Sequence, residues 1–237
     1  MDYGSPDYYG FSKAFKMKDF GAVKTCLGIE FKQDKKKREV FISQEKYINA
    51  VLKRFGMSEF TSRPDIAYAV NFMSQFNSCY TVDHWKAAKR ILRYLSGTKT
   101  VGLLFKQTGD DLYGVVDADW GGNLTDRRSY SGQAFVLAGA AISWEARKQR
   151  TVALSSTESE YLAMSEAVKE ALYLKALLNR IGLKFKCVSI FNDNESAKHL
   201  VKGFGFHPRT KHIDVRHHFI QEYMWSICRQ SVCPQMF

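Results

Sequence analysis

The stretch VVDADWGG, residues 115–122, decides the fold that we predict for this chain. Its residues alternate between two faces as those of a β-strand do, so either of its aspartates could point into a site. Two further strands should follow, Ser131–Ala138 and Ala141–Arg147, and Gly139 lies where an antiparallel hairpin between them would turn. The pattern predicts a sheet that begins with an acidic strand.

A long helix is predicted to begin within ALSSTESEY, residues 153–161. Ser155 and Glu158 have the spacing of a capping box, which gives Glu158 a local role at the start of the helix. Glu160 instead shares a face with an apolar stripe. The members of that stripe are Met164, Ala167, Ala171, Leu174, Leu178 and Ile181. A carboxylate that faces a sheet is costly unless it is paired or coordinated, so a ligand role is favoured over a structural role for Glu160.

A third acidic position lies in SIFNDNESA, residues 189–197. Asp193 ends a predicted strand, Cys187–Asn192, and precedes a predicted helix, Glu195–Val201, where an aspartate is also an ordinary N-cap. From this stretch alone, cap and ligand remain equally open. Together with Asp117 and Glu160, however, Asp193 could complete a cluster of carboxylates, whose oxygens are the ligands that hard divalent cations prefer.

Composition sets the outer limits of the interpretation. A chain of 237 residues with 45% hydrophobic content can bury a core and form one or two domains. Its net charge of +11 makes a polyanionic partner plausible without naming it. Five cysteines without a CxxC pair predict reduced thiols, and no signal peptide or membrane span is evident. The expected location is intracellular, in the cytoplasm or the nucleus.

The first hundred residues are predicted to be mixed α and β. Strand-like runs at Cys26–Lys32 and Val40–Ser43 precede a helix that Gly56 is placed to cap. Asp83 is expected to begin a second, amphipathic helix, which has an apolar face and a basic face. The basic face consists of Lys86, Lys89, Arg90 and Arg93. Such a face is either simply solvated or contacts phosphates.

Several long motifs resemble the C-terminal end of the Pol polyprotein of copia-type retrotransposons. They include RPDIAYAVN (63–71), DHWKAAKRILRYLSGT (83–98), GVVDADWGGNLTDRRSYSGQAF (114–135), ALSSTESEYLAMSEAVKEALYLKALL (153–178), DNESA (193–197) and RTKHIDVRHHFIQE (209–222). FKMKDFGAVKTCLGIEF (15–31) and ISQEKYINAVLKRFGM (42–57) resemble the part of the reverse transcriptase that follows its polymerase active site. The motifs occur in the order of the family.

The resemblance implies an α/β fold: an RNase H-like mixed sheet with flanking helices, residues 110–237, preceded by a small α+β reverse-transcriptase remnant, residues 1–58, and a connection segment, residues 59–109. It places Asp117, Glu160 and Asp193 at the family's catalytic carboxylates. The implied activity is metal-dependent endonucleolytic cleavage of RNA in RNA–DNA hybrids, with two Mg²⁺ or Mn²⁺ ions as cofactors. The implied partners are a hybrid or other nucleic acid and other retrotransposon Pol products, with no membrane.

The segment RTKHIDVRHH, residues 209–218, supplies further candidates. Asp214 is a candidate fourth carboxylate, although an N-cap role suits its position better. Three basic residues near it could contact phosphate. These are Arg209, Lys211 and Arg216.

The sequence also departs from the family. The YVDD-like strand on which polymerisation depends is absent, so polymerase activity is not expected. A longer connecting stretch would separate Phe60 from Thr61, which suggests an internal deletion. The final MWSICRQSVCPQMF does not resemble the closing strand and helix, so we expect cleavage to be impaired. A catalytically inactive nucleic-acid-binding remnant and a non-functional transposon fragment are the alternatives.

Overall fold

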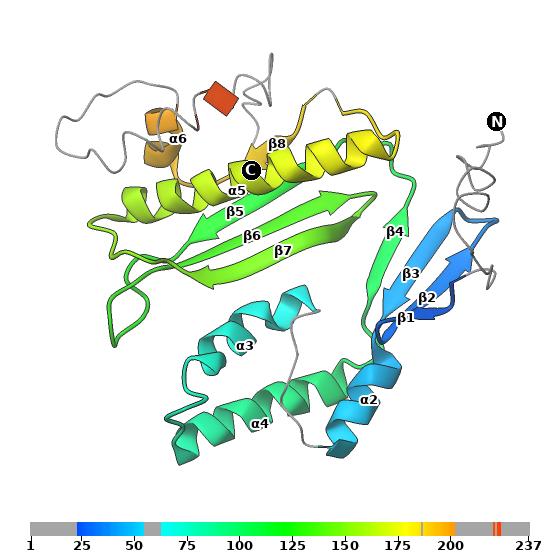
Figure 1. Cartoon of the computed structure of the whole chain (residues 1–237), viewed down its shortest axis with the longest axis horizontal. Helices are drawn as coiled ribbons and strands as arrows, with labels where there is room; N and C mark the ends of the chain where they lie inside the picture. The colour runs from blue at the N-terminus through cyan, green and yellow to red at the C-terminus, as the bar shows by residue number, and fades with distance from the viewer. Residues whose placement is uncertain (1–22, 55–62, 186, 202–219, 221, 224–237) are drawn as a thin grey trace, which may run out of the picture.

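The computed structural model describes residues 23–54, 63–185, 187–201, 220, 222 and 223. Two four-stranded sheets and their helices make up this part of the chain (Figure 1). Helix α5 (Ser156–Arg180) lies along one face of the second sheet, and helices α3 (Ala67–Ser74) and α4 (Val82–Gly97) lie together beyond strand β7 (Ala140–Lys148) (Figure 1). The expected α/β class is confirmed.

The first sheet is antiparallel throughout, in the order β1-β2-β3-β4. Its strands are β1 (Thr25–Cys26), β2 (Ile29–Asp34), β3 (Glu39–Ser43) and β4 (Leu103–Lys106). The single strand expected at Cys26–Lys32 is wrong, because Leu27 and Gly28 have positive φ values of 49° and 78° and turn the chain between β1 and β2. Strand β4 was not predicted. Strand β4 pairs with β3, although three α-helices separate the two strands in the sequence. The sheet therefore combines three strands that precede these helices in the chain with one strand that follows them.

Helices α2 (Glu45–Arg54), α3 (Ala67–Ser74) and α4 (Val82–Gly97), with the short helix η1 (Pro64–Ile66), lie between β3 and β4 in the chain. Helix α2 contacts β2 of this sheet, whereas α3 and η1 contact β7 of the second sheet. A small core of Ile48, Ile66 and Leu95 joins α2, η1 and α4. The amphipathic helix is confirmed as α4, although its N-cap is Thr81. The Thr81 hydroxyl accepts from the His84 backbone amide, and His84 Nδ1 accepts from the Thr81 amide, which completes a capping box.

The second sheet has the order β7-β6-β5-β8. Its strands are β5 (Tyr113–Ala118), β6 (Tyr130–Leu137), β7 (Ala140–Lys148) and β8 (Ser189–Phe191). The predicted hairpin is confirmed, since Ala138 and Gly139 both have positive φ at the turn from β6 to β7. Helix α5 (Ser156–Arg180) then crosses over to β8, which pairs parallel with β5, and α6 (Glu195–Val201) follows.

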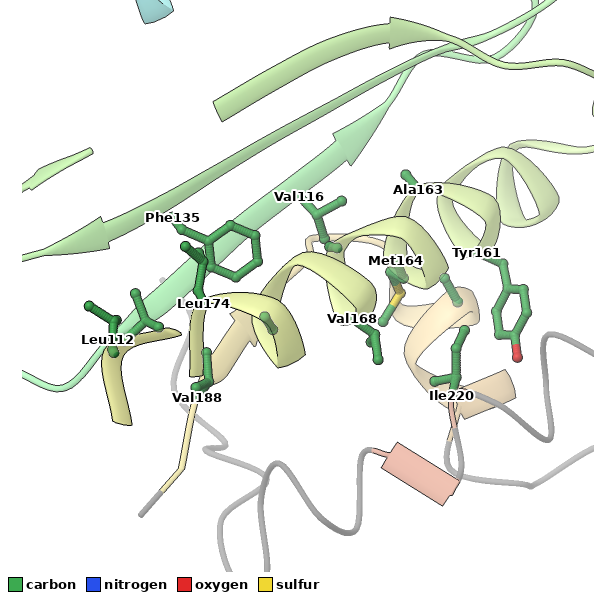
Figure 2. Packing of buried hydrophobic residues seen from close by; sticks show 14 residues of the cluster. Leu112, Val116, Phe135, Tyr161, Ala163, Met164, Val168, Leu174, Val188 and Ile220 are labelled. Carbon is green, nitrogen blue, oxygen red and sulfur yellow. The ribbon is translucent and has the colours of Figure 1, made fainter. Parts of the chain in front are cut away.

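The main core lies between α5 and this sheet (Figure 2). Val116 of β5 and Phe135 of β6 are buried against the apolar stripe of α5, which runs from Met164 to Leu178. The stripe ends there, because Ile181 follows the helix and is exposed. This packing fixes the start of α5, and with it Glu160, above the end of β5.

We expect Gly114→Ala to destabilise this core. A Cβ at Gly114 would lie 2.5 Å from the Phe135 ring, whereas a Cβ at Gly132 on the neighbouring strand would meet no atom within 4 Å. Overpacking of this kind costs about 1–3 kcal/mol. Urea unfolding should show that loss for Gly114→Ala and little change for Gly132→Ala. Equal midpoints for the two variants would contradict the packing described.

A polar contact joins α3 to the second sheet. The Gln75 side-chain amide, directly after α3, donates to the Tyr130 hydroxyl. Gln75 Oε1 accepts from Asn123 (3.2 Å) and from Lys148 (2.6 Å). The rings of Tyr68 and Phe72 pack on Tyr130, whose burial raises its pKa to about 12. Helix α3 is therefore anchored to the sheet.

No helix within the described residues is both long and apolar enough to cross a membrane. Cys26 and Cys79 are free and exposed. Cys187 is disulfide-bonded, so the expectation of reduced thiols is wrong at that position.

Candidate metal centre

Asp117, Glu160 and Asp193 converge at the end of the second sheet. One carboxylate oxygen from each lies within 4.8 Å of the other two. The parallel pairing of β5 with β8 explains part of this convergence, because Val115 is opposite Phe191 and the same register two residues further places Asp193 beside Asp117. The predicted convergence is confirmed, and the role of these side chains as ligands stays a prediction.

Asp193 does not cap helix α6. The cap is made by Asn194, whose side-chain oxygen accepts from the Ala197 backbone amide at 2.9 Å. The cap alternative for Asp193 is therefore wrong, and the ligand alternative stays a prediction. The exposed Asp193 carboxylate faces the cluster rather than the helix end.

Glu160 is the buried member of the cluster, with 6% of its surface exposed. Burial raises the pKa of its carboxyl above the ordinary value, and the carboxylates of Asp117 and Asp193 act in the same direction. Hydrogen bonds from the Asn192 side chain and the Ala118 backbone oppose this shift. A buried carboxylate beside two others favours a compensating positive charge.

Asn192 was missed by the sequence analysis. It is 3% exposed, and its side-chain amide donates to Glu160 Oε2 (2.9 Å) and to the Val116 carbonyl (3.1 Å). Asn192 thus holds the helix carboxylate against β5. The sequence marks Asn192 only as a polar residue directly after the apolar β8, and nothing in that stretch identifies its two acceptors, which come from other elements.

Asp119, the second aspartate of the first stretch, has a structural role. Its Oδ1 accepts from the backbone amides of Tyr130 (2.7 Å) and Gly122 (3.4 Å), so it supports the loop that follows β5. Glu158 is also occupied locally, as predicted. Its carboxylate accepts from the Leu154 amide (2.8 Å), and its own amide donates to the Ser155 hydroxyl (3.1 Å).

The donors of the cluster suit a hard divalent cation. All three are carboxylates, two of them exposed to solvent and one buried, and they come from three elements that the core holds together. Within the described residues these three form the one such group. Asp214, the candidate fourth ligand, lies outside the described residues, as do Arg209, Lys211 and Arg216.

The predicted basic face of α4 is exposed. Lys86, Lys89, Arg90 and Arg93 all lie on the solvent side of the helix. Lys86 pairs with Asp83 at 2.9 Å, but both side chains are well solvated, so this ion pair contributes little stability. Exposure is compatible both with a solvated face and with phosphate contacts.

No family model matches the chain. It is 37% identical to the retrovirus-related Pol polyprotein from transposon TNT 1-94 of Nicotiana tabacum over 256 residues, covering 89% of the chain and 19% of that protein. It is 40% identical to the Pol polyprotein from transposon RE1 of Arabidopsis thaliana, covering 70% and 11%. It is 52% identical to the secreted RxLR effector protein 161 of Plasmopara viticola, covering 50% and 84%.

Among solved structures, RNase H1 of the archaeon Halobacterium salinarum is 12% identical, with a TM-score of 0.36, covering 47% of this chain and 77% of that one. This distant likeness carries no argument about the fold. The mixed sheet in the order β7-β6-β5-β8, with one parallel crossover and carboxylates from β5, α5 and the end of β8, is compatible with the RNase H-like arrangement that the family resemblance implied.

The chain belongs to the family of retrovirus-related Pol polyproteins from transposons. The chain spans 19% of the length of the Nicotiana relative and 11% of the length of the Arabidopsis one. The 256 residues aligned with the Nicotiana relative exceed the 237 residues of this chain, so that relative contains residues without a counterpart here. This is compatible with the internal deletion expected from the sequence.

Proposed function

We propose that this chain is a metal-dependent endonuclease that cleaves the RNA strand of RNA–DNA hybrids, with slow turnover. The observation that carries the proposal is the convergence of Asp117, Glu160 and Asp193 within 4.8 Å on an RNase H-like sheet. The Pol polyprotein relatives support a nucleic-acid substrate. We also propose that it acts inside the cell, in the cytoplasm or nucleus, beside other Pol products.

Asp117, Glu160 and Asp193 would hold Mg²⁺ or Mn²⁺. Bound divalent ions supply an activated water and relieve negative charge on the leaving oxygen in phosphodiester hydrolysis. Asp117 and Asp193 are open to solvent and can approach a phosphate through such ions, whereas Glu160 is fixed by Asn192 and can set the position of the cluster. Three carboxylates, the number found among the described residues, give sparse support for two ions, which is the basis for expecting slow turnover.

Cleavage should be tested under single-turnover conditions with the full chain in excess over a labelled hybrid. We expect cutting of the RNA strand with Mg²⁺ or Mn²⁺, and none after chelation with EDTA. RNA and DNA duplexes of the same sequence serve as matched controls. Binding of the hybrid without any cutting under these conditions would favour the alternative of an inactive nucleic-acid-binding remnant.

The basic face of α4 is proposed to contact the phosphate backbone. Neutralised phosphates release counterions, so the affinity for hybrid should fall steeply as salt increases. Replacing Lys86, Lys89, Arg90 and Arg93 together by alanine should flatten the plot of log affinity against log salt by about 3–4 units if each side chain contacts one phosphate. Fluorescence anisotropy across a salt series measures this slope. An unchanged slope would identify the face as merely solvated.

A further inference from the structure

An apolar groove lies between α3 and α4, the two helices beyond β7 in Figure 1. Its walls come from both helices and from the segment that joins them, and they include Val70, Met73, Phe76, Tyr80, Trp85 and Leu92. Two of these aromatic side chains are open to solvent, with Tyr80 74% exposed and Trp85 39% exposed. An exposed apolar surface bordered by charge is typical of a binding site.

The two helices that form the groove carry mostly positive charge, and Lys89 borders the groove itself. Residues 67–97, which form both helices and their connection, contain four basic residues and one acidic residue, Asp83. The ammonium group of Lys89 lies 5.9 Å from the centroid of the Trp85 ring, so a cation stands next to an exposed aromatic face. Exposed aromatic rings bordered by cations suit the binding of unpaired nucleotides, because a base can stack on the ring while its phosphate pairs with the cation.

The groove also has a fixed position relative to the carboxylate cluster. Gln75 immediately precedes Phe76 of the groove wall and is hydrogen-bonded to the Tyr130 side chain. The Tyr130 backbone amide donates to Asp119, two residues after Asp117. A few residues therefore connect the groove wall to the end of the sheet where the carboxylates converge.

We propose that the groove between α3 and α4 binds unpaired nucleotides that continue from an RNA–DNA hybrid. Their bases stack on Trp85 and Tyr80, and their phosphates pair with Lys89 and the adjacent basic residues of α4. The inference rests on the nucleic-acid binding in the proposed function, and it is independent of cleavage. It makes a hybrid with a single-stranded extension the preferred substrate class.

The test compares three ligands: a blunt hybrid, the same hybrid with about ten unpaired nucleotides, and a version whose extension is abasic. Anisotropy with the full chain should show about tenfold tighter binding of the base-bearing extension than of the abasic one, since stacking is lost in the latter. Trp85→Ala and Tyr80→Ala should each remove most of that gain and leave blunt-hybrid binding unchanged. Tyr173→Ala, an exposed tyrosine on α5, is the matched control and should change nothing. Thermal unfolding confirms that each variant folds.

Equal affinity for the base-bearing and abasic extensions would overturn the proposal. So would a base-dependent gain that survives both Trp85→Ala and Tyr80→Ala. A dimer that sedimentation detects in the parent chain and not in Trp85→Ala, with no base-dependent gain, would assign the groove to a second copy instead. Weak, salt-independent binding of the blunt hybrid counts against the proposed function. In that case, anisotropy with an isolated single strand and its abasic counterpart still tests the groove, because only the base-bearing strand should bind tightly.

Discussion

Asp117→Asn should reduce Mg²⁺-dependent cleavage of the hybrid by roughly a hundredfold or more, because metal-ion catalysis supplies several kcal/mol of charge stabilisation. Asp117 lies within 4.8 Å of both other carboxylates, so an amide at this position removes one of three charges that would hold the ions. Asparagine keeps the shape of the side chain, so the loss should come from charge and not from packing. Calorimetric titration with Mn²⁺ checks the binding step separately from cleavage.

Two matched variants sharpen this test. Asp119→Asn keeps an oxygen that can accept from the Tyr130 and Gly122 amides, and it should retain Mn²⁺ binding because Asp119 supports the loop rather than the cluster. Asp111→Asn removes an exposed acidic charge before β5 and controls for net charge. If Asp119→Asn abolished Mn²⁺ binding while Asp117→Asn retained it, the assignment of the two aspartates would be reversed.

The local pattern was sufficient to predict strands β5, β6 and β7 and the helix that carries Glu160, whereas the mixed sheet that pairs β8 with β5 was implied only by the family resemblance. Alternation identified β5, the apolar stripe placed Glu160 toward the sheet, and the hairpin at Gly139 followed from its turn residues. These features depend on residues that are close in sequence. An amphipathic helix or a hairpin can be predicted from its own residues, without knowledge of the rest of the chain.

Pairing between distant residues was harder to predict. Strand β4 pairs with β3, which lies more than fifty residues earlier in the chain. The four residues Leu103–Lys106 contain no pattern that predicts this partner. Asn192 shows the same limit at the site, because its amide joins Val116 and Glu160 from two other elements. The break at Leu27 was missed for a different reason: a positive φ is uncommon for a leucine, so only Gly28 marked the turn.

Glu160→Gln should abolish the site and stabilise the metal-free protein. Glutamine keeps an oxygen that can accept from Asn192 and removes the buried charge beside Asp117 and Asp193. Because the pKa of Glu160 is raised in the folded state, its contribution to stability is fully present below the ordinary pKa of 4.5 and is lost as pH rises through the folded value. At pH 7.5 in EDTA, the variant should therefore be more stable by on the order of 1 kcal/mol.

The pH dependence and the response to metal distinguish this charge effect from a general effect of the substitution. The advantage of Glu160→Gln in urea unfolding should shrink as pH falls toward 4.5, where the parent carboxyl becomes protonated as well. Mg²⁺ should raise the unfolding midpoint of the parent chain and not that of the variant, because an ion that binds only the folded site stabilises it. Glu166→Gln, on the same helix and partly exposed in a pair with Lys169, should differ little from the parent in both measurements. A parent chain that is more stable than Glu160→Gln in EDTA at pH 7.5 would mean that the buried carboxylate is already compensated without metal, and the case for an ion at this cluster would fail.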